Sequence, residues 1–321
     1  MNFHDRLRAR DKLNQKTRGF FQARDFLEVE TPILVPSPGT DVFIDVFESE
    51  YVTPFAREKC FLQTSPEFAM KTLLVKGCKK IYQITKAFRN GEVSDTHNVE
   101  FTILEWYRAE ENLDAIIEDV KELVMETCSF PASDFSMMTM NALFLASCQI
   151  DIVNSQTKSS LENALINSVG LPAFAKTNKD YDWNDLFFHT LVEYVEPFLA
   201  TLEAVFVTHW PIRLAVLAQQ NSEDPRVADR FELYIDGLEI ANGFQELRDA
   251  KEQRRRFEED NEERKRLGKK QLPLPEDFLS ALEQGLPRCA GVALGLDRLL
   301  MVSSGCSTIS DLLPFKFRPK N

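Results

Sequence analysis

The segment FELYIDGLEIANGF, residues 231–244, constrains the fold more than any other part of the chain. It places an Asp-Gly dipeptide, Asp236 and Gly237, between two runs rich in apolar and aromatic side chains. An Asp-Gly pair in this setting is the strongest short-range signal for a β-hairpin with a two-residue turn. The segment therefore predicts antiparallel sheet, with the turn at these two residues.

The register of this hairpin brings two carboxylates together. A two-residue turn makes Tyr234 face Glu239 and Glu232 face Ala241, which puts Glu232 and Glu239 diagonally on one face of the sheet. Two carboxylates that close repel each other unless a cation lies between them, and Mg²⁺ typically takes one or two carboxylates together with substrate phosphates. Two interpretations stay open, a Mg²⁺ site or two solvated glutamates on an exposed face.

Strict alternation along the second strand separates these carboxylates from the polar residues that follow. It puts Asn242, Phe244 and Glu246 on the face opposite to Glu239. Either Gly243 marks a β-bulge that turns these side chains to the same face, or the two sets do not share a site.

The rest of the chain alternates between helix and strand signals. Ser65, Pro66 and Glu67 predict the start of a helix over 65–74, with Ser65 as the N-cap and Pro66 at the first helical position. Further helices are predicted over 4–26, 113–128, 158–168, 184–196, 247–267 and 275–285, and strands over 27–35, 59–64, 80–88 and 98–109. An antiparallel sheet with helices outside it is an α+β domain.

A second candidate site lies on the predicted strand pair 80–88 and 98–109. Alternation puts one aromatic and polar set on a single face of the second strand: Val99, Phe101, Ile103, Glu105 and Tyr107. A solvated glutamate beside scattered aromatics would give the same pattern. Arg89 opens the polar loop between the strands, where its guanidinium group is placed to grip a phosphate.

The segment CAGVALGLDRLLMVSS, residues 289–304, predicts a strand, a glycine and a helix. Gly291 and Gly295 bracket the strand, and Gly295 is expected to allow a tight passage into the helix. Arg298 then lies in the first helical turn, where backbone N–H groups, the helix dipole and the arginine make an anion site. A packing glycine and a local pair between Arg298 and Asp297 is the alternative.

Charge and composition exclude several function classes. Thirty-eight Lys and Arg against fifty Asp and Glu leave a net charge of −12, which speaks against a protein held to nucleic acid by phosphate neutralisation. The six cysteines and four histidines lack the close spacing of a zinc cage or a disulfide scaffold. The charged start has no signal core, and no apolar run is long enough for a membrane span. We expect a cytoplasmic protein without a metal cage.

The order of these signals resembles the three motifs of the class II aminoacyl-tRNA synthetases. The matching residues are the helix and strand ending in Pro32, then Phe88-Arg89 with His97-Asn98 and Glu100-Phe101, and the terminal Gly295-Leu296-Asp297-Arg298. The segments FRN…HNVEFTILEWY and LEIANGFQEL…GVALGLDRL are most similar to lysyl-tRNA synthetases. Within that group they are most similar to the short paralogues that ligate (R)-β-lysine to elongation factor P. The resemblance covers nearly the whole chain.

The resemblance implies an antiparallel six-stranded sheet that holds ATP. In this family the position of Arg89 binds the α-phosphate, Phe101 lies on one face of adenine, and Arg298 lies on the other face near the γ-phosphate. The remaining ATP-side positions are Asn90, Gly91, Glu92, His97, Asn98, Glu239, Ile240 and Gly295. By the same similarity Glu232 and Glu239 hold Mg²⁺.

The resemblance also implies a pocket for a lysine-like amino acid. Its positions are Ser65, Pro66, Glu67, Glu105, Tyr107, Asn242, Phe244, Glu246 and Ala293. Such a pocket surrounds a long aliphatic stem and meets its cationic end with carboxylates and a phenol.

The chain departs from the family pattern at four positions. Gly91 stands where the second motif usually carries glutamate, with Glu92 following it, and Thr96 and Val99 replace an arginine and a proline. Ala293 stands where lysyl-tRNA synthetases have glycine. Its methyl group would narrow the pocket floor and favour a β-amino isomer over α-lysine.

The function implied is ATP-dependent formation of an aminoacyl-adenylate, followed by transfer to a lysine of elongation factor P. A truncated lysyl-tRNA synthetase that charges tRNA, and a catalytically lapsed paralogue that binds amino acid or nucleotide, are the alternatives. The motifs occupy residues 1–321 as one catalytic domain and leave no room for an N-terminal anticodon-binding domain, so tRNA is not the expected partner. The first motif, residues 12–34, implies a homodimer.

Overall fold

The computed structural model describes residues 2–128, 130–178 and 180–315. The chain forms two compact units, which are described separately. The first comprises Met1–Phe130 and Gln245–Asn321, and the second comprises Pro131–Phe244. That the whole chain acts as one catalytic domain stays a prediction.

The sheet of the first unit has the strand order β1-β5-β6-β11. These strands are β1 (Leu27–Glu28), β5 (Lys80–Phe88), β6 (Glu100–Ala109) and β11 (Cys289–Gly295). The β5–β6 and β6–β11 pairs are antiparallel, as predicted, whereas β1 pairs with β5 in parallel. The sheet is therefore mixed, because its edge strand reaches β5 by a long crossover instead of a hairpin.

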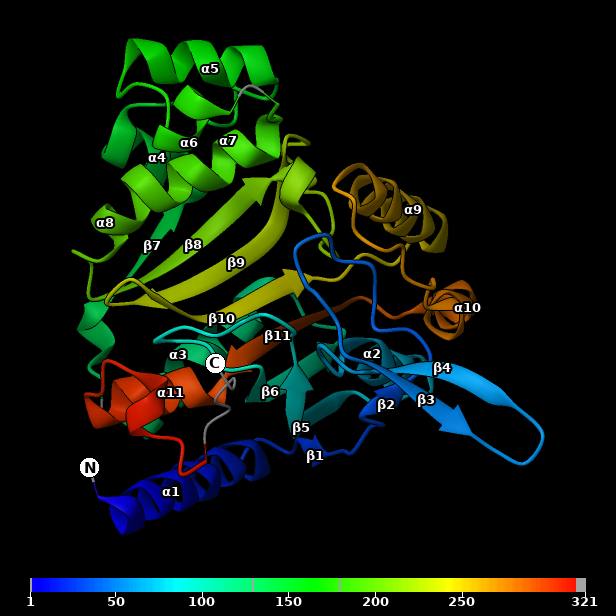
Figure 1. Ribbon diagram of the computed structural model, residues 1–321. Helices are drawn as coiled ribbons and strands as arrows, with labels where there is room; N and C mark the ends of the chain where they lie inside the picture. The colour runs from blue at the N-terminus through cyan, green and yellow to red at the C-terminus, as the bar shows by residue number, and fades with distance from the viewer. Residues whose placement is uncertain (1, 129, 179, 316–321) are drawn as a thin grey trace. The chain divides into compact units, whose positions relative to one another are not determined.

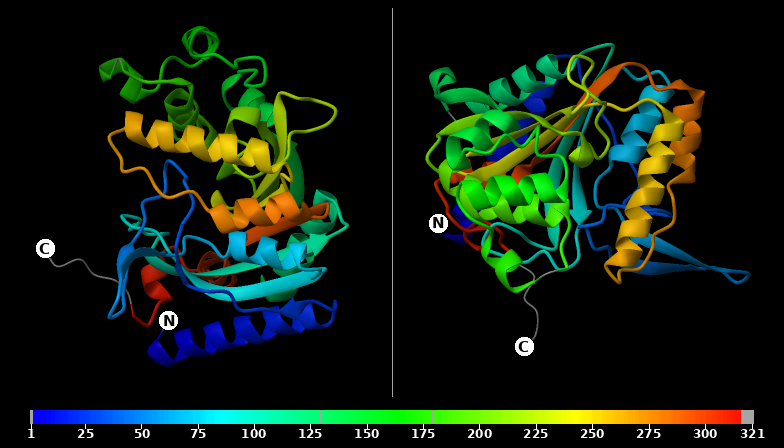
Figure 2. Two further views of the ribbon diagram at one scale, coloured as in Figure 1. Left: turned by 90° about the vertical axis from the view of Figure 1, so that its right-hand side faces the viewer. Right: turned by 90° about the horizontal axis from the view of Figure 1, so that it is seen from above.

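A small antiparallel sheet with the order β2-β4-β3 also belongs to the first unit. It contains β2 (Leu34–Val35), β3 (Glu48–Val52) and β4 (Arg57–Leu62). β3 is exposed along its whole length, and the β3–β4 hairpin projects from the body of its unit (Figure 2). The predicted single strand over 27–35 is wrong. It is split into β1 and β2, with Pro32, which has no backbone N–H to give to a ladder, between them.

The first unit also contains helices. They are α1 (Phe3–Gln22), α2 (Glu67–Val75), α3 (Leu113–Cys128), α9 (Ala250–Arg266), α10 (Glu276–Gly285) and α11 (Leu296–Ser304), with a short 3₁₀ turn at Ile309–Asp311. α1 lies beside α3 and α11 (Figure 1). Its buried Phe21 stacks on Tyr82 of β5, with 4.3 Å between ring centroids.

The start of α2 differs from the prediction by one residue. The helix begins at Glu67, so Pro66 takes the N-cap position and Ser65 precedes it. Ser65 still acts on the helix start, because its hydroxyl accepts the backbone N–H of Glu67 at 3.2 Å.

The second unit contains a sheet with the strand order β10-β9-β8-β7. The strands are β7 (Phe135–Thr139), β8 (Ala204–Pro211), β9 (Val227–Ile235) and β10 (Leu238–Gln245). β8–β9 and β9–β10 are antiparallel, and β7 pairs with β8 in parallel. The helices are α4 (Met140–Cys148), α5 (Lys158–Asn167), α6 (Ala173–Thr177), α7 (Trp183–Thr190) and α8 (Glu196–Leu199), with 3₁₀ turns at Ala132–Asp134 and Ile212–Leu214.

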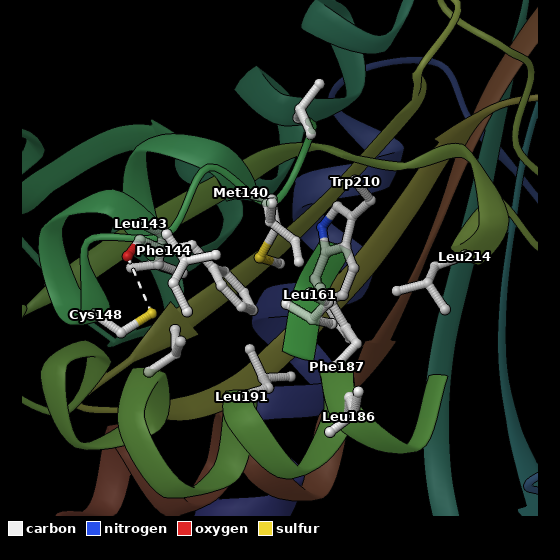
Figure 3. Packing of buried hydrophobic residues seen from close by; sticks show 14 of the residues in the cluster. Met140, Leu143, Phe144, Cys148, Leu161, Leu186, Phe187, Leu191, Trp210 and Leu214 are labelled. Atoms are coloured by element: carbon white, nitrogen blue, oxygen red, sulfur yellow. Dashed lines mark hydrogen bonds between the residues drawn. The ribbon is translucent and has the colours of Figure 1, made fainter. Parts of the chain in front are cut away.

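Large aromatic side chains fill the core of the second unit. Phe144 of α4 and Phe187 of α7 are fully buried and stack with ring centroids 5.2 Å apart. Figure 3 shows Trp210 of β8 beside them, together with the hydrogen bond that Cys148 donates to the carbonyl of Phe144 at 3.2 Å.

The predicted continuous helix over 184–196 is interrupted. One π-helical turn, Leu191–Val195, separates α7 from α8. Pro197 follows directly at the start of α8. A proline lacks the N–H for an i→i−4 bond and its ring collides with that carbonyl, so the turn before it widens.

In the described part of the chain, no helix is both long and apolar enough to cross a membrane.

Candidate active site

One face of β6, in the first unit, carries two of the residues predicted to bind the amino acid, Glu105 and Tyr107. Glu105 and Tyr107 share this face, as the alternation predicts, and lie opposite Ala293 and Gly291 of β11. Both Glu105 and Tyr107 are buried. The Tyr107 hydroxyl and the Ser65 hydroxyl each donate to the Glu105 carboxylate at 2.6 Å. Hydrogen bonds to Glu105 thus link the loop before α2 to the middle of β6.

A buried lysine joins two further carboxylates of this unit. Lys71 Nζ lies 2.5 Å from Glu67 Oε1 and 2.5 Å from Glu246 Oε2. Both glutamates are predicted members of the amino-acid pocket, whereas Lys71 is not among the predicted residues. The available signal was its spacing, because Glu67 and Lys71 lie four residues apart on one face of a helix.

Burial and mutual repulsion raise the pKa values of Glu105 and Glu246. Loss of hydration, followed by the charge of Glu67, raises the pKa of Glu105 to about 7. Loss of hydration also dominates at Glu246, whose pKa is raised to about 8 although Lys71 opposes the shift. A cationic ligand would favour the ionised form of each acid.

The loop after β5 places the predicted phosphate-binding arginine beside an aromatic ring. The guanidinium carbon of Arg89 lies 5.2 Å from the ring centroid of Phe101, and its Nη1 atom lies 3.8 Å from the Glu92 carboxylate. The backbone N–H of Arg89 is fixed by the Val99 carbonyl at 3.0 Å. The Asn98 amide donates to the Glu100 carbonyl at 2.6 Å, so both ends of the loop are anchored.

Backbone conformation accounts for the glycine that departs from the family pattern. Gly91 has φ +83°, in the left-handed region where a side chain is disfavoured. Its neighbour Asn90 donates its backbone N–H to the Asp45 carbonyl at 2.7 Å. The Glu92 carboxylate, one residue later, is the acid that faces Arg89.

Arg298 contacts the other end of the same loop. Its Nη2 atom lies 2.5 Å from Nε2 of His97, and its Nε atom lies 3.5 Å from the Thr96 carbonyl. Because arginine can only donate, Nε2 of His97 accepts and the ring proton resides on Nδ1, which lies 2.8 Å from the Ser94 hydroxyl.

Two expectations about the start of α11 are corrected. Asp297 does not pair with Arg298; it pairs with Arg10 of α1 and accepts the backbone N–H of Thr102 at 2.8 Å. Gly295 has an ordinary φ of −70°, and a Cβ there would lie 3.5 Å from the Arg298 side chain. The backbone therefore does not require glycine at this position.

The β9–β10 hairpin of the second unit confirms the predicted turn and corrects the register. Asp236 and Gly237 have φ of 49° and 76°, the positive values of a two-residue hairpin turn. Glu239 faces Tyr234, as predicted. The pairing then shifts between Glu239 and Ala241, so a bulge lies at the buried Ile240 and not at Gly243.

This bulge resolves the alternation conflict. Beyond it Asn242 faces Glu232, where Ala241 was expected, and Phe244 faces Arg230. Directly paired residues project to the same face of a sheet. Glu232, Glu239, Asn242 and Phe244 therefore share one face of the hairpin.

Glu232 is held by its own strand. It is buried, forms an ion pair with Arg230 at 2.5 Å and accepts a hydrogen bond from the Tyr234 hydroxyl. Burial, and repulsion from Glu239 against the opposing pull of Arg230, raise the pKa of Glu232 to about 7. Arg230, which sequence analysis did not identify, also covers Trp210, with its guanidinium carbon 4.1 Å from the ring centroid.

The carboxylates of this hairpin suit a divalent cation that is shared with a phosphate ligand. No group of three or more His, Cys, Asp or Glu suited to a metal occurs among residues 2–128, 130–178 and 180–315. Two neighbouring carboxylates are the number that Mg²⁺ takes when phosphate oxygens and water complete its shell. The donor set fits Mg²⁺ in that mode.

Known proteins match this chain over almost its whole length. The family model of the class II tRNA synthetases (D, K and N) matches residues 1–319. Among curated proteins, the elongation factor P–(R)-β-lysine ligase of Proteus mirabilis is 42% identical over 95% of this chain and 92% of its own length. The protein of the same name from Haemophilus influenzae is 40% identical over 95% of this chain and 93% of its own length.

Proposed function

We propose that this chain, which belongs to the class II tRNA synthetases (D, K and N), is an ATP-dependent ligase that attaches (R)-β-lysine, or lysine, to a lysine side chain of elongation factor P. Its relatives are named elongation factor P–(R)-β-lysine ligases, and each is matched over more than nine-tenths of its length. The residues of the chain support the two chemical steps as follows.

The charge of the acidic cluster is the observation that carries the proposal. Glu67, Glu105 and Glu246 supply three carboxylates in the first unit, and the Lys71 ammonium neutralises one. When a cationic ligand favours the ionised forms of these acids, their negative charge exceeds what Lys71 neutralises. A lysine or β-lysine molecule whose two amino groups are both protonated matches that excess, whereas an amino acid with a neutral or acidic side chain would leave it uncompensated.

Activation of the amino acid needs positioning and charge stabilisation but no protein nucleophile. An oxygen of the amino-acid carboxylate attacks the α-phosphorus of ATP, the bond to the β-phosphate oxygen breaks, and pyrophosphate leaves. In this proposal Arg89 binds the α-phosphate, where negative charge gathers in the transition state, and Arg298 binds the γ-phosphate. Phe101 and Arg298 lie on the two faces of adenine, and Asn98 and His97 belong to the loop that faces ATP.

Mg²⁺ would neutralise phosphate charge when bound. Glu232 and Glu239 would hold it in the second unit, and Arg230 and Tyr234 fix the Glu232 carboxylate for that role. Asn242 and Phe244, which share this face, are assigned to the amino-acid substrate.

Transfer completes the reaction. The neutral ε-amine of the acceptor lysine attacks the carbonyl carbon of the adenylate, an amide bond forms, and AMP leaves with the electrons of the broken mixed anhydride bond. The acceptor amine loses its proton to solvent. Residues 12–34 are proposed to form a homodimer interface, and a cytoplasmic location follows from the modification of a translation factor.

Mass spectrometry of purified elongation factor P tests the proposal. Elongation factor P is incubated with this protein, ATP, Mg²⁺ and one lysine isomer at a time. In parallel reactions the tRNA specific for lysine replaces elongation factor P. A mass increase of one aminoacyl group on a lysine supports the proposal. Charging of tRNA without modification of the factor would instead identify a tRNA synthetase, and the absence of both with intact nucleotide binding would identify a lapsed paralogue.

A further inference from the structure

Lys71 occupies an unusual position for a helix lysine. Its side chain is 1% exposed, and its ammonium bridges Glu67, one turn earlier on α2, to Glu246, which follows β10 in sequence. The ring of Phe278 on α10 lies 5.8 Å from the same nitrogen and closes the apolar side of the site. Two segments far apart in sequence are thus joined by one cation.

Stability does not account for this arrangement. An ordinary i,i+4 pair on a helix surface contributes only tenths of a kcal/mol. A fully buried ion pair is often no more stabilising than apolar residues of the same volume. A lysine that is buried among three acids therefore points to a requirement for charge.

Other ionisable groups around Lys71 are mostly acidic. β6 contributes Glu105 and Tyr107, and β11 contributes the Cys289 thiol, whose pKa is raised by burial and by Glu246. The charges of Lys71 and Arg248 oppose this rise in the pKa of Cys289. From α10 the contact is the Phe278 ring, which carries no charge. Lys71 directly touches Glu67 and Glu246.

We propose that Lys71 is a positioning residue for amino-acid recognition, which holds Glu67 and Glu246 together, favours the ionised form of Glu246 and aims both carboxylates at the substrate ammonium group. Without this cation, the buried Glu246 would be repelled by Glu67 and Glu105 and would bind its proton more tightly, and the pocket would lose charge for its ligand. The two opposed acids also hold Lys71 itself protonated, so its amine does not compete with the acceptor lysine for the activated carboxyl group.

The experiment compares Lys71→Met, which removes the charge at similar length, with Lys71→Arg, which keeps the charge. Lys121→Met is the matched control, because Lys121 is also a helix lysine, 3.9 Å from Glu118, but lies in a partly exposed pair on α3. Two readouts are measured for each protein. One is the ¹³C shift of the Glu246 carboxyl against pH in the ligand-free protein, assigned by difference from Glu246→Gln, and the other is ATP–pyrophosphate exchange driven by each lysine isomer.

In Lys71→Met the midpoint of the Glu246 titration is expected to rise by about one pH unit or more. The KM for the amino acid should rise at least about tenfold at pH 7.5 and recover as the pH approaches 9, with the KM for ATP unchanged. Lys71→Arg should restore the titration midpoint, and Lys121→Met should match the wild type in both readouts.

A purely structural role gives a different result. Lys71→Met and Lys71→Arg would then behave alike, with a lower melting temperature, an unmoved Glu246 titration and a KM that does not depend on pH. That result would overturn the inference. The kinetic readout rests on the proposed function, but the titration does not, so a wild-type protein inactive with both isomers would refute the function while the ¹³C titration still decides the role of Lys71.

Discussion

Tyr107 of β6 and Gly291 of β11 face each other across an antiparallel pair, and the phenol ring covers the glycine so closely that a Cβ at Gly291 would overlap it. The same Cβ would lie 3.0 Å from Oε1 of Glu246. The absence of a side chain at Gly291 therefore gives Tyr107 and Glu246 the room to take their places among the buried acids.

Gly291→Ala is expected to disturb the amino-acid pocket. The ring must move away from Glu105, and overpacking of this kind costs about 1–3 kcal/mol. We expect a lower melting temperature and a higher KM for the amino acid in pyrophosphate exchange. Gly19→Ala in α1 is the control, because no atom lies within 4 Å of a Cβ there and alanine favours the helix. Equal behaviour of the two variants would contradict this account of Gly291.

Ala293→Gly tests the discrimination between lysine isomers. Ala293 lies opposite Glu105 in the β6–β11 register, beside the proposed substrate amine. Removal of its methyl group should enlarge the pocket floor and raise the kcat/KM for α-lysine relative to (R)-β-lysine. Pyrophosphate exchange with each isomer gives the ratio, and an unchanged ratio would refute the steric explanation.

Arg89→Ala is expected to abolish pyrophosphate exchange with the fold intact. A fixed donor on the reacting phosphoryl group is worth about 3–4 kcal/mol, on the order of 10²–10³ in rate. Arg57→Ala is the control, since Arg57 forms an exposed pair with Glu50 at 3.4 Å on the β3–β4 hairpin. Near-normal exchange in Arg89→Ala, with circular dichroism unchanged in both, would remove Arg89 from the proposed mechanism.

Arg10→Ala is expected to destabilise the first unit. Asp297 is 3% exposed, and the loss of Arg10 would remove the cation from a buried carboxylate that also accepts the Thr102 N–H. Breaking such a pair costs about 3–5 kcal/mol. Arg18→Ala, on the same helix but in an exposed pair with Glu28, should cost less than about 1 kcal/mol. Urea unfolding measures both, and similar losses would contradict a special role for Arg10.

Asp260→Asn is expected to stabilise the protein increasingly at higher pH. Burial, with repulsion from Asp41, raises the pKa of Asp260 to about 7 from an ordinary value of 3.8. The folded state therefore holds a proton that the unfolded state releases, so the wild-type carboxyl loses stability as the pH rises from about 4 to 7. Asparagine stays neutral and can keep a hydrogen bond to Thr40.

The advantage of Asp260→Asn should grow by about 2 kcal/mol between pH 5 and pH 8, when unfolding is measured at both. Asp277→Asn on the exposed side of α10 controls for the loss of one negative charge. An advantage that is constant with pH would show that Asp260 does not carry the shifted proton.

The sequence by itself determined those parts of the structure that depend only on neighbouring residues. The Asp-Gly turn, the β5–β6 pair and the common face of Glu105 and Tyr107 were predicted correctly, because turn chemistry and alternation act over a few residues. The order of the motifs also gave the family, which the comparisons show.

Only the tertiary structure decided what depends on partners far apart in the chain. The bulge at Ile240 puts Glu239 and Asn242 on one face, and no residue type in the segment marks its position. Asp297 pairs with Arg10 from the other end of the chain instead of its neighbour Arg298. The sequence around Lys71 predicts an ordinary helix lysine, and its burial against Glu246 is visible only in the tertiary structure. Alternation and capping fix the face on which a side chain starts, but its charge partner is fixed by which segments pack together.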